Sequence, residues 1–198
     1  FASAATTLSS PTNCRASPYG LNTNWQSVGA VLDGATGTVA VSGTQNFQGL
    51  QFATNNYVLT GGALNMGGAT FVSVGVADAT INSALTGSGP LDKQGSGRLT
   101  LGGASTYTGG TTLSAGIIQV TTATALGTGS LAMGAFTTLE AGASVALANA
   151  ISLTATTNID TAANTLTLNG VIAALARQTS TSLVLARWSS TAPTPMLA

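Results

Sequence analysis

A short alternation of apolar and polar residues, broken by small polar residues and glycine, is the feature that most constrains this chain. Apolar side chains take every second position over three to five residues, and Gly, Ser, Thr or Asn follow. A period of two is typical of a strand and not of a helix. The chain is therefore predicted to be all-β, with many short strands and glycine-rich turns. The pairs that place two side chains on one face are Val39 and Val41, Leu64 and Met66, Leu99 and Leu101, Leu131 and Met133, Val145 and Leu147, Ile151 and Leu153, Leu166 and Leu168, and Leu183 and Leu185.

The composition excludes several classes of function. Charged residues make up 5% of the 198 residues and the net charge is zero, so no basic field attracts nucleic acid and no nucleic-acid partner is expected. Histidine is absent, which removes the commonest general base and metal ligand. Cys14 is the single cysteine and has no histidine to activate it, so it is interpreted as an unpaired surface thiol. We expect no cofactor.

The apolar stretches are short. The longest, such as 171–176 and 145–153, fall well below the roughly 20 residues of a membrane-spanning helix, so no such helix is predicted. The chain begins at Phe1 without a basic segment followed by an apolar one, so no signal peptide is expected. It is interpreted as a fragment of a longer protein.

The chain also repeats itself imperfectly. Residues 91–94 and 99–101 have an echo 84 residues later at 175–178 and 183–185, and 81–85 resembles 168–172. Periodicity alone fits a sandwich, a barrel or a solenoid. Repetition favours a right-handed parallel β-helix, with coils of roughly 20 to 25 residues and about eight or nine coils in the chain. Asn and Gln are expected to stack in ladders between coils.

One segment of about thirty residues carries a specific motif. Residues 91–120 read LDKQGSGRLTLGGASTYTGGTTLSAGIIQV. This segment resembles the passenger-associated transport repeat of bacterial autotransporters, and residues 36–172 resemble such passengers more loosely. The matching positions are Leu91, Lys93, Gly95, Gly97, Leu99, Leu101, the run 106–112 and Gly116.

The resemblance implies a structural passenger segment that helps secretion and folding and forms a stalk or an adhesin. It implies a location in the medium or on the surface of a Gram-negative cell. The implied partners are the protein's own outer-membrane translocator barrel and a ligand on a host surface, such as a glycan. It does not imply an enzyme.

The repeat pattern divides the chain into three parts. Residues 1–35 are predicted to be an N-terminal segment or an irregular first coil, and residues 36–172 the β-helix repeat region. Residues 173–198 are predicted to be a degenerate repeat or an irregular tail, because Thr179 and Thr181 stand where the echo needs glycine. Pro193 and Pro195 would also interrupt strand pairing.

Several residues of the motif have predicted positions. Gly95 and Gly97 are expected in turns that need a positive φ or a close backbone approach, and Gly109 and Gly110 at the next corner. Leu99 and Leu101 should point inward. The ring of Tyr107 is expected to lean on a neighbouring coil with its hydroxyl at the rim, and a platform for stacking sugars is its alternative role. Asp92 and Lys93 are interpreted as exposed rim charges on opposite faces.

Two alternatives come from other functional classes. A secreted β-helix enzyme acting on carbohydrate would need two acids that converge in a groove. An ice-binding or carbohydrate-binding module would need a rank of threonines or aromatics on one face. The Thr-x-Thr pairs that begin at 106, 122, 154, 165 and 179 are irregularly spaced. No catalytic, cofactor-binding or metal-binding residue is therefore predicted. The acids to be weighed are Asp33, Asp78, Asp92, Glu140 and Asp160.

Overall fold

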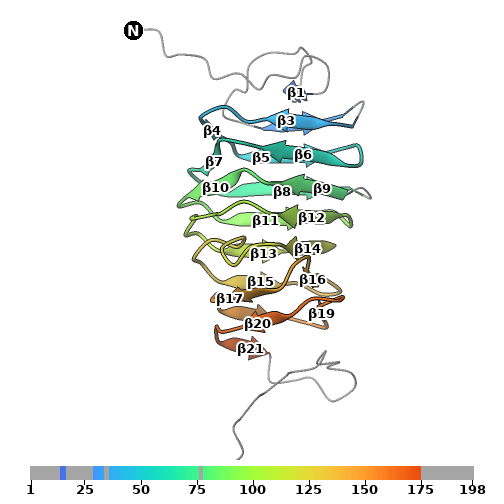
Figure 1. Ribbon diagram of the computed structural model, residues 1–198, viewed down its shortest axis with the longest axis vertical. Coiled ribbons are helices and arrows are strands. Elements are labelled where there is room, and N and C mark those ends of the chain that lie inside the picture. The colour runs from blue at the N-terminus through green and yellow to red at the C-terminus, as the bar shows by residue number, and fades with distance from the viewer. Residues whose placement is uncertain (1–13, 17–28, 34–35, 76–77, 175–198) are drawn as a thin grey trace, which may run out of the picture.

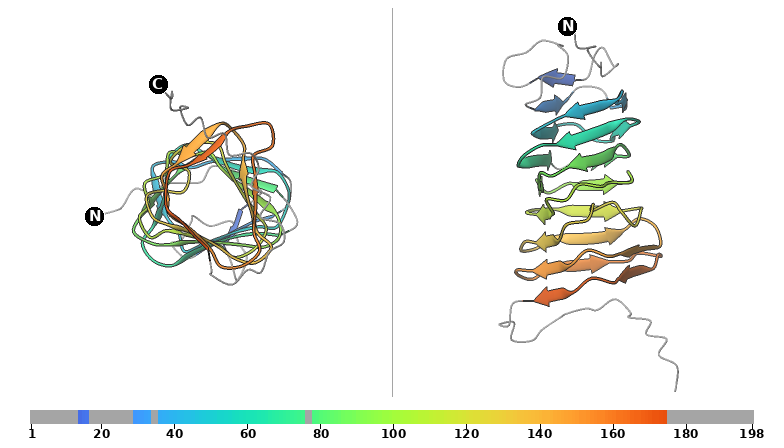
Figure 2. Two further views of the ribbon diagram at one scale, coloured as in Figure 1. Left: turned by 90° about the horizontal axis from the view of Figure 1, so that it is seen from below. Right: turned by 90° about the vertical axis from the view of Figure 1, so that its left-hand side faces the viewer.

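The protein is a parallel β-solenoid of about seven turns (Figure 1). A computed structural model describes residues 14–16, 29–33, 36–75 and 78–174. The described part is all-β and contains no helix, which confirms the predicted fold class. Seen along the axis, the coils superpose around one centre, and the strands form distinct sides (Figure 2). No helix in the described residues has the length and apolar character required to cross a membrane.

Two long sheets form two sides of the solenoid. The nine-stranded sheet is parallel except where its first strand pairs antiparallel with the second. Its strands, in order, are β1 (Cys14–Ala16), β2 (Ala30–Leu32), β5 (Gly49–Phe52), β8 (Thr70–Val74), β11 (Leu91–Gln94), β13 (Thr111–Leu113), β15 (Leu131–Met133), β18 (Ile151–Leu153) and β21 (Ile172–Ala174). The seven-stranded sheet contains β3 (Thr38–Ala40), β6 (Tyr57–Thr60), β9 (Asp78–Ile81), β12 (Arg98–Leu101), β14 (Ile117–Val120), β16 (Thr138–Ala141) and β19 (Asn158–Asp160).

The third side changes character along the axis. It begins as a three-stranded sheet of β4 (Thr44–Asn46), β7 (Ala63–Met66) and β10 (Ala84–Gly87). It ends as a two-stranded sheet of β17 (Val145–Leu147) and β20 (Leu166–Leu168). Between these sheets, residues 102–110 and 121–130 contain no strand. The buried side chains of Tyr107, Ala125 and Leu126 fill the core there.

Strand register sets the length of a coil. Residues paired in parallel on the nine-stranded sheet are 20 to 22 positions apart, as in Ala30 with Leu50, Leu50 with Val72, and Leu91 with Thr111. This agrees with the lower end of the predicted coil length. The 84-residue echo is not the structural register, because successive pairings lead from Leu91 through Thr111, Leu131 and Ile151 to Ile172, which is 81 positions away. Because the coils differ in length, no constant spacing in the sequence matches the pairing of residues along the whole solenoid.

The core is one continuous column of inward side chains. Leu99 and Leu101 are buried as predicted, and so are Leu64, Met66, Leu131 and Met133. The outward positions carry Thr, Ser, Asn and Gln. On the three-stranded sheet, Asn65 Nδ2 donates to Asn46 Oδ1 at 2.7 Å, so one step of the expected amide ladder is present. Inward positions therefore supply the hydrophobic stabilisation, while backbone pairing joins the coils.

Glycine allows the corners to pack as closely as they do. Gly95 has φ +77°, and a Cβ there would lie 2.1 Å from the Val74 carbonyl oxygen of the preceding coil. Gly97 lies in the same turn and donates its amide to that carbonyl at 3.1 Å. A Cβ on Gly109 would lie 2.4 Å from the Gly89 carbonyl carbon. The predicted close approach of backbones at these corners is confirmed.

The two ends of the chain contain sequence predictions that the structure does not describe. Strand β2 lies within the predicted 1–35 segment and pairs in parallel with β5, so it stacks in line with the coils. Residues 175–198, which hold the echo at 175–185 and both prolines of the predicted tail, lie outside the described residues. The side chain of Cys14 is also outside the description.

Candidate functional site

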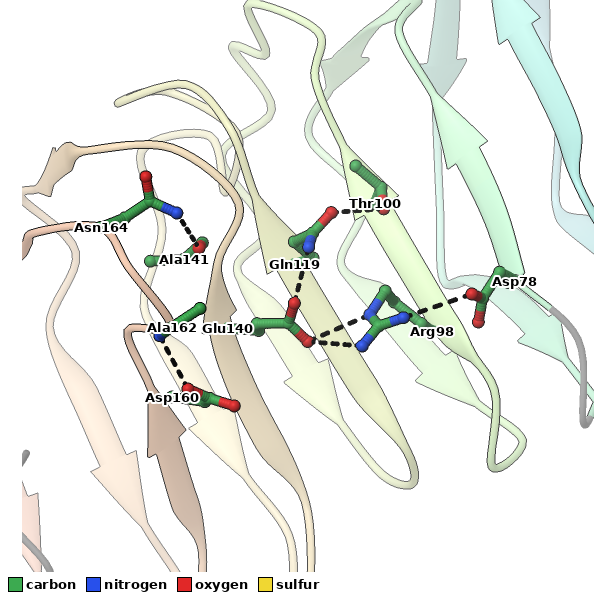
Figure 3. Close-up of polar contacts among 9 residues, drawn as sticks. All are labelled: Asp78, Arg98, Thr100, Gln119, Glu140, Ala141, Asp160, Ala162 and Asn164. Atoms are coloured by element: carbon green, nitrogen blue, oxygen red, sulfur yellow. Dashed lines mark hydrogen bonds and ion pairs between the residues drawn. The ribbon is translucent and has the colours of Figure 1, made fainter.

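Three of the five acids lie on the outer face of the seven-stranded sheet (Figure 3). Asp78 begins β9, Glu140 lies on β16 and Asp160 ends β19. Register explains their approach, because Glu140 pairs with Asp160 and Asp78 pairs with Arg98 on β12. The stacking of coils therefore brings together Arg98 and Glu140, which are 42 positions apart in sequence.

Arg98 joins two of these acids across the coils. Its Nη1 lies 3.2 Å from Asp78 Oδ2, and its Nη2 lies 2.9 Å from Glu140 Oε2. Nε also donates to Glu140 Oε2 at 3.0 Å. The hydrogen bond with Glu140 raises the pKa of Arg98, against the desolvation that lowers it, and the charges of Glu140 and Asp78 add to the rise. The guanidinium bridges residues 20 and 42 positions away.

Two neutral side chains complete this network. Gln119 Nε2 donates to Glu140 Oε1 at 2.7 Å, and Thr100 Oγ1 donates to Gln119 Oε1 at 2.9 Å. Asp160 is exposed, and its Oδ1 accepts the backbone amide of Ala162 at 2.8 Å. We call Asp78, Arg98, Thr100, Gln119 and Glu140 the outer network.

The outer network is arranged as a brace between coils and not as an acid pair. The Glu140 side chain is only 12% exposed and faces Arg98 and Gln119, so its charge is balanced within the network. Among the described residues, no group of three or more Asp, Glu, Cys or His side chains could hold a metal ion. The geometry is therefore that of a set of hydrogen bonds and ion pairs that joins four successive coils.

Lys93 is the clearest correction to the sequence analysis. It was interpreted as an exposed rim charge, but its side chain is fully buried in the core column between Val72 and Leu113. Its Nζ donates to the carbonyl oxygens of Gln94 at 3.0 Å, Gly95 at 2.8 Å and Ala115 at 3.2 Å. Burial lowers the pKa of Lys93 to about 8, although the charge of Asp92 raises it. Its long apolar stem fits the core while the ammonium reaches the corner.

The Lys93 contacts join two coils. Gln94 and Gly95 belong to its own coil, and Ala115 belongs to the next one. We call this arrangement the lysine clamp. The positive φ of Gly95 and Gly116 shapes the two stacked corners that receive it. Adjacent positions on a strand face opposite ways, so the prediction that Asp92 and Lys93 point apart is right, and only the inward side was assigned wrongly.

A second clamp was missed. Asn149 is buried, and its Nδ2 lies within 2.6 to 3.4 Å of the carbonyl oxygens of Leu126, Gly127 and Gly129 in the preceding coil. The sequence signal is an amide residue one coil length after a glycine corner, between two short apolar strands. This pattern can be recognised only when the coil length is known.

Tyr107 also differs from its prediction. Its ring packs against Gly127 of the next coil, as expected, since a Cβ there would lie 2.8 Å from the ring Cδ1. Its hydroxyl is buried and hydrogen-bonded to Thr111 Oγ1, so it does not lie at the rim. Burial raises the pKa of Tyr107 to about 12, and the bond to Thr111 partly opposes this. A buried ring has no face for a sugar, so the stacking role is excluded for Tyr107.

The threonine pairs do not form one rank. Thr106 and Thr122 lie in strand-free segments of the third side, Thr154 follows β18 on the nine-stranded sheet, and Thr165 precedes β20. The fifth pair begins at Thr179, outside the described residues. A flat array needs one pair per coil in register, so these positions disfavour an ice-binding face.

Comparison with protein families identifies the segment that contains the lysine clamp. The family model of the passenger-associated transport repeat matches residues 91–120. Residues 91–120 are a passenger-associated transport repeat. The transport repeat thus includes β11, β12, β13 and β14 and spans a full coil with the start of the next. The sequence resemblance is confirmed, and the transport repeat indicates an autotransporter passenger segment.

A curated relative agrees with this assignment. The chain is 36% identical over 129 residues to the adhesin BmaC autotransporter of Brucella suis biovar 1 (strain 1330). The alignment covers 54% of this chain and 4% of the relative, so the chain spans a small part of that protein. No solved structure matches the chain.

Proposed function

We propose that this chain is a stretch of a structural stalk in an autotransporter passenger, and that its transport repeat promotes folding of the stalk during secretion. The stalk lies on the surface of a Gram-negative cell or is released from it, and presents an adhesive surface. The observation that carries the proposal is the lysine clamp, in which one buried side chain bonds corners of two successive coils within the transport repeat.

The physical argument is that a solenoid gains stability from contacts between neighbours. Each coil pairs with the coil before and after it, so folding can propagate from a stable coil to the next. The Lys93 ammonium cannot bond Ala115 until the following coil is in place. The ammonium therefore gains its third carbonyl acceptor together with the new coil, and this hydrogen bond adds to the backbone pairing that holds that coil in place. No energy source outside the cell is needed for this step.

The partners follow from the same proposal. A passenger requires a translocator barrel in the outer membrane, and we propose that the parent protein supplies it. The outer network supports a role without catalysis, because its acids bond to Arg98 and Gln119 across coils. For the chain itself we propose residues 36–172 as the stalk, flanked by the 1–35 and 173–198 segments.

Deleting single coils tests this function. Residues 91–110 and 131–150 each form one register unit, because Thr111 pairs with Leu91 and Ile151 pairs with Leu131. Either deletion therefore leaves the remaining strands in register. The chain would be placed ahead of an autotransporter translocator, and surface display measured by labelling of intact cells.

Deletion of 91–110 should reduce display several-fold, whereas deletion of 131–150 should reduce it little. Circular dichroism of the two purified chains controls for loss of the fold. Equal display from both deletions, with both chains folded, would contradict a special role for the transport repeat.

A further inference from the structure

Phe71 is an aromatic side chain on the outer face of the nine-stranded sheet. It is 43% exposed, whereas its neighbours along the pairing direction are small or polar. Its ring lies across Gly49 on the preceding strand, where a Cβ would be only 2.3 Å from the ring Cζ. Because Gly49 has no side chain, the ring of Phe71 can pack directly against the backbone of the sheet, and the opposite face of the ring is toward solvent.

Strand pairing places polar side chains beside this ring. Asp92 on β11 pairs with Phe71 on β8, at the usual spacing of about 4.8 Å between strands, and Gln94 pairs with Ser73. Asp92 Oδ2 accepts from Gln94 Nε2 at 2.6 Å, and Oδ1 accepts from Ser114 Oγ. These bonds orient the carboxylate and leave about two of its roughly four lone-pair positions open to a ligand.

The ring and the polar groups line one hollow. Ala69, Thr70, Phe71, Asp92 and Gln94 surround an open depression of about 240 Å³. The hollow is open to solvent. A carbohydrate subsite needs an aromatic face for the C–H groups of the sugar and a few fixed polar groups for its hydroxyls.

We propose that this hollow binds a single pyranose unit of a glycan, stacked on Phe71 and hydrogen-bonded to Asp92 and Gln94. The proposal rests on the proposed function in one respect, because display on a cell surface is what brings the hollow to glycans. A sugar hydroxyl both donates and accepts, which suits the acceptor Asp92 beside the amide of Gln94. A cation would use only the acceptors, and a single phenylalanine is a weaker cation platform than tryptophan.

Saturation-transfer NMR on the purified 198-residue chain tests the site. The probes are the methyl glycosides of glucose, galactose, mannose and N-acetylglucosamine. We expect transfer to the ring C–H protons of at least one glycoside, and a loss of affinity of about tenfold or more in Phe71→Ala, as for an aromatic anchor. Asp92→Asn should weaken binding less, because the amide keeps one acceptor oxygen.

Two further variants keep the result interpretable. Phe136 is 86% exposed at a corner away from the hollow, so Phe136→Ala removes a comparable aromatic and should leave transfer unchanged. Phe71→Trp keeps a stacking face and should retain binding. Circular dichroism confirms that each chain is folded.

The proposal is overturned if none of the four glycosides shows transfer, or if folded Phe71→Ala binds as well as the parent. A lysine amide, used as a fifth probe, tests whether the hollow binds a cation instead of a sugar. Transfer to that probe alone, lost in Phe71→Ala and weakened in about 1 M salt, would replace the sugar with a cation. Absence of sugar binding by the parent chain, with display reduced by the 91–110 deletion, would refute only this site. Sugar binding by the parent chain, with display unaffected by the 91–110 deletion, would refute only the folding role.

Discussion

The transport repeat and the coils that follow it are built on the same plan but are not packed equally. In residues 91–120 every inward strand residue from Leu91 to Val120 is buried, and the ammonium of the buried Lys93 is hydrogen-bonded to backbone carbonyls. In β17 and β20, Val145, Leu166 and Leu168 are only partly buried. Strands β11 and β12 pair with a neighbour on each side, whereas β19 and β20 each pair with one described strand.

Burial in this solenoid thus depends on the neighbouring strands more than on the local sequence. The pattern Leu-Thr-Leu occurs at 99–101 and again at 166–168. The first copy is buried because β9 and β14 flank it, and the second is partly exposed with only β17 beside it. Identical local sequences therefore contribute unequally to stability.

Truncation of these two leucine sites should give the largest contrast. Leu99→Ala removes a fully buried side chain and should lower the free energy of unfolding by about 3 kcal/mol. Leu166→Ala removes a partly buried one and should cost about 1 kcal/mol. Urea unfolding followed by circular dichroism measures both. Equal losses would show that the two regions are equally packed in solution.

The lysine clamp should make stability depend on pH in the transport repeat. Lys93 has a pKa of about 8 in the folded chain and 10.5 as its ordinary value, so between these values the unfolded chain holds more protons and stability rises with pH. The rise should be at most about 3 kcal/mol. Below pH 8 the clamp adds no slope.

Lys93→Met should remove that rise, and urea midpoints taken at pH 7.5 and 9.5 would detect it. Measurements stay below pH 10 because the raised pKa of Tyr107 has the opposite effect. Above pH 10 the unfolded chain loses the tyrosine proton first, so stability falls. A parent chain whose stability is flat from pH 8 to 10 would contradict a buried, desolvated Lys93.

The Asn149 clamp connects the better packed and the less packed coils. Asn149→Ala leaves the carbonyls of Leu126, Gly127 and Gly129 without this donor and should cost about 1 to 2 kcal/mol. Asn169→Ala, at an exposed corner one coil later, is the matched control and should change stability by less than about 0.5 kcal/mol. Hydrogen exchange of the Thr128 amide would report local opening. Equal losses of stability in the two variants would show that the hydrogen bonds of Asn149 do not stabilise the fold.

The outer network should have the smallest effect. Arg98→Met breaks the bridge between Asp78 and Glu140, and the Arg98 side chain is 35% exposed, so we expect a loss of about 0.5 to 1 kcal/mol. Because the contribution is electrostatic, the difference from the parent chain should shrink in about 1 M salt. Asp160→Asn, outside the network, should change little. A loss of stability that does not depend on salt would show that Arg98 acts through packing of its aliphatic stem and not through its charge.

The strands, the inward leucines and the glycine corners could be predicted from the amino-acid sequence. Each of these depends on residues within a few positions, since alternation sets the faces and a missing Cβ permits the backbone approach at Gly95 and Gly109. The transport repeat could also be recognised, because its motif is continuous over residues 91–120.

The side-chain contacts between coils could not be predicted in this way and are known from the folded structure. Lys93, Asn149 and the outer network depend on pairing residues that are 19 to 23 positions apart, and unequal coils shift that distance from turn to turn. An error of one residue in the coil length turns an inward side chain outward. Lys93 lies two positions after Leu91 and shares its inward face, but its charge favoured the rim, and only the folded corners supply the carbonyls of Gln94, Gly95 and Ala115 that accept its hydrogen bonds in the core.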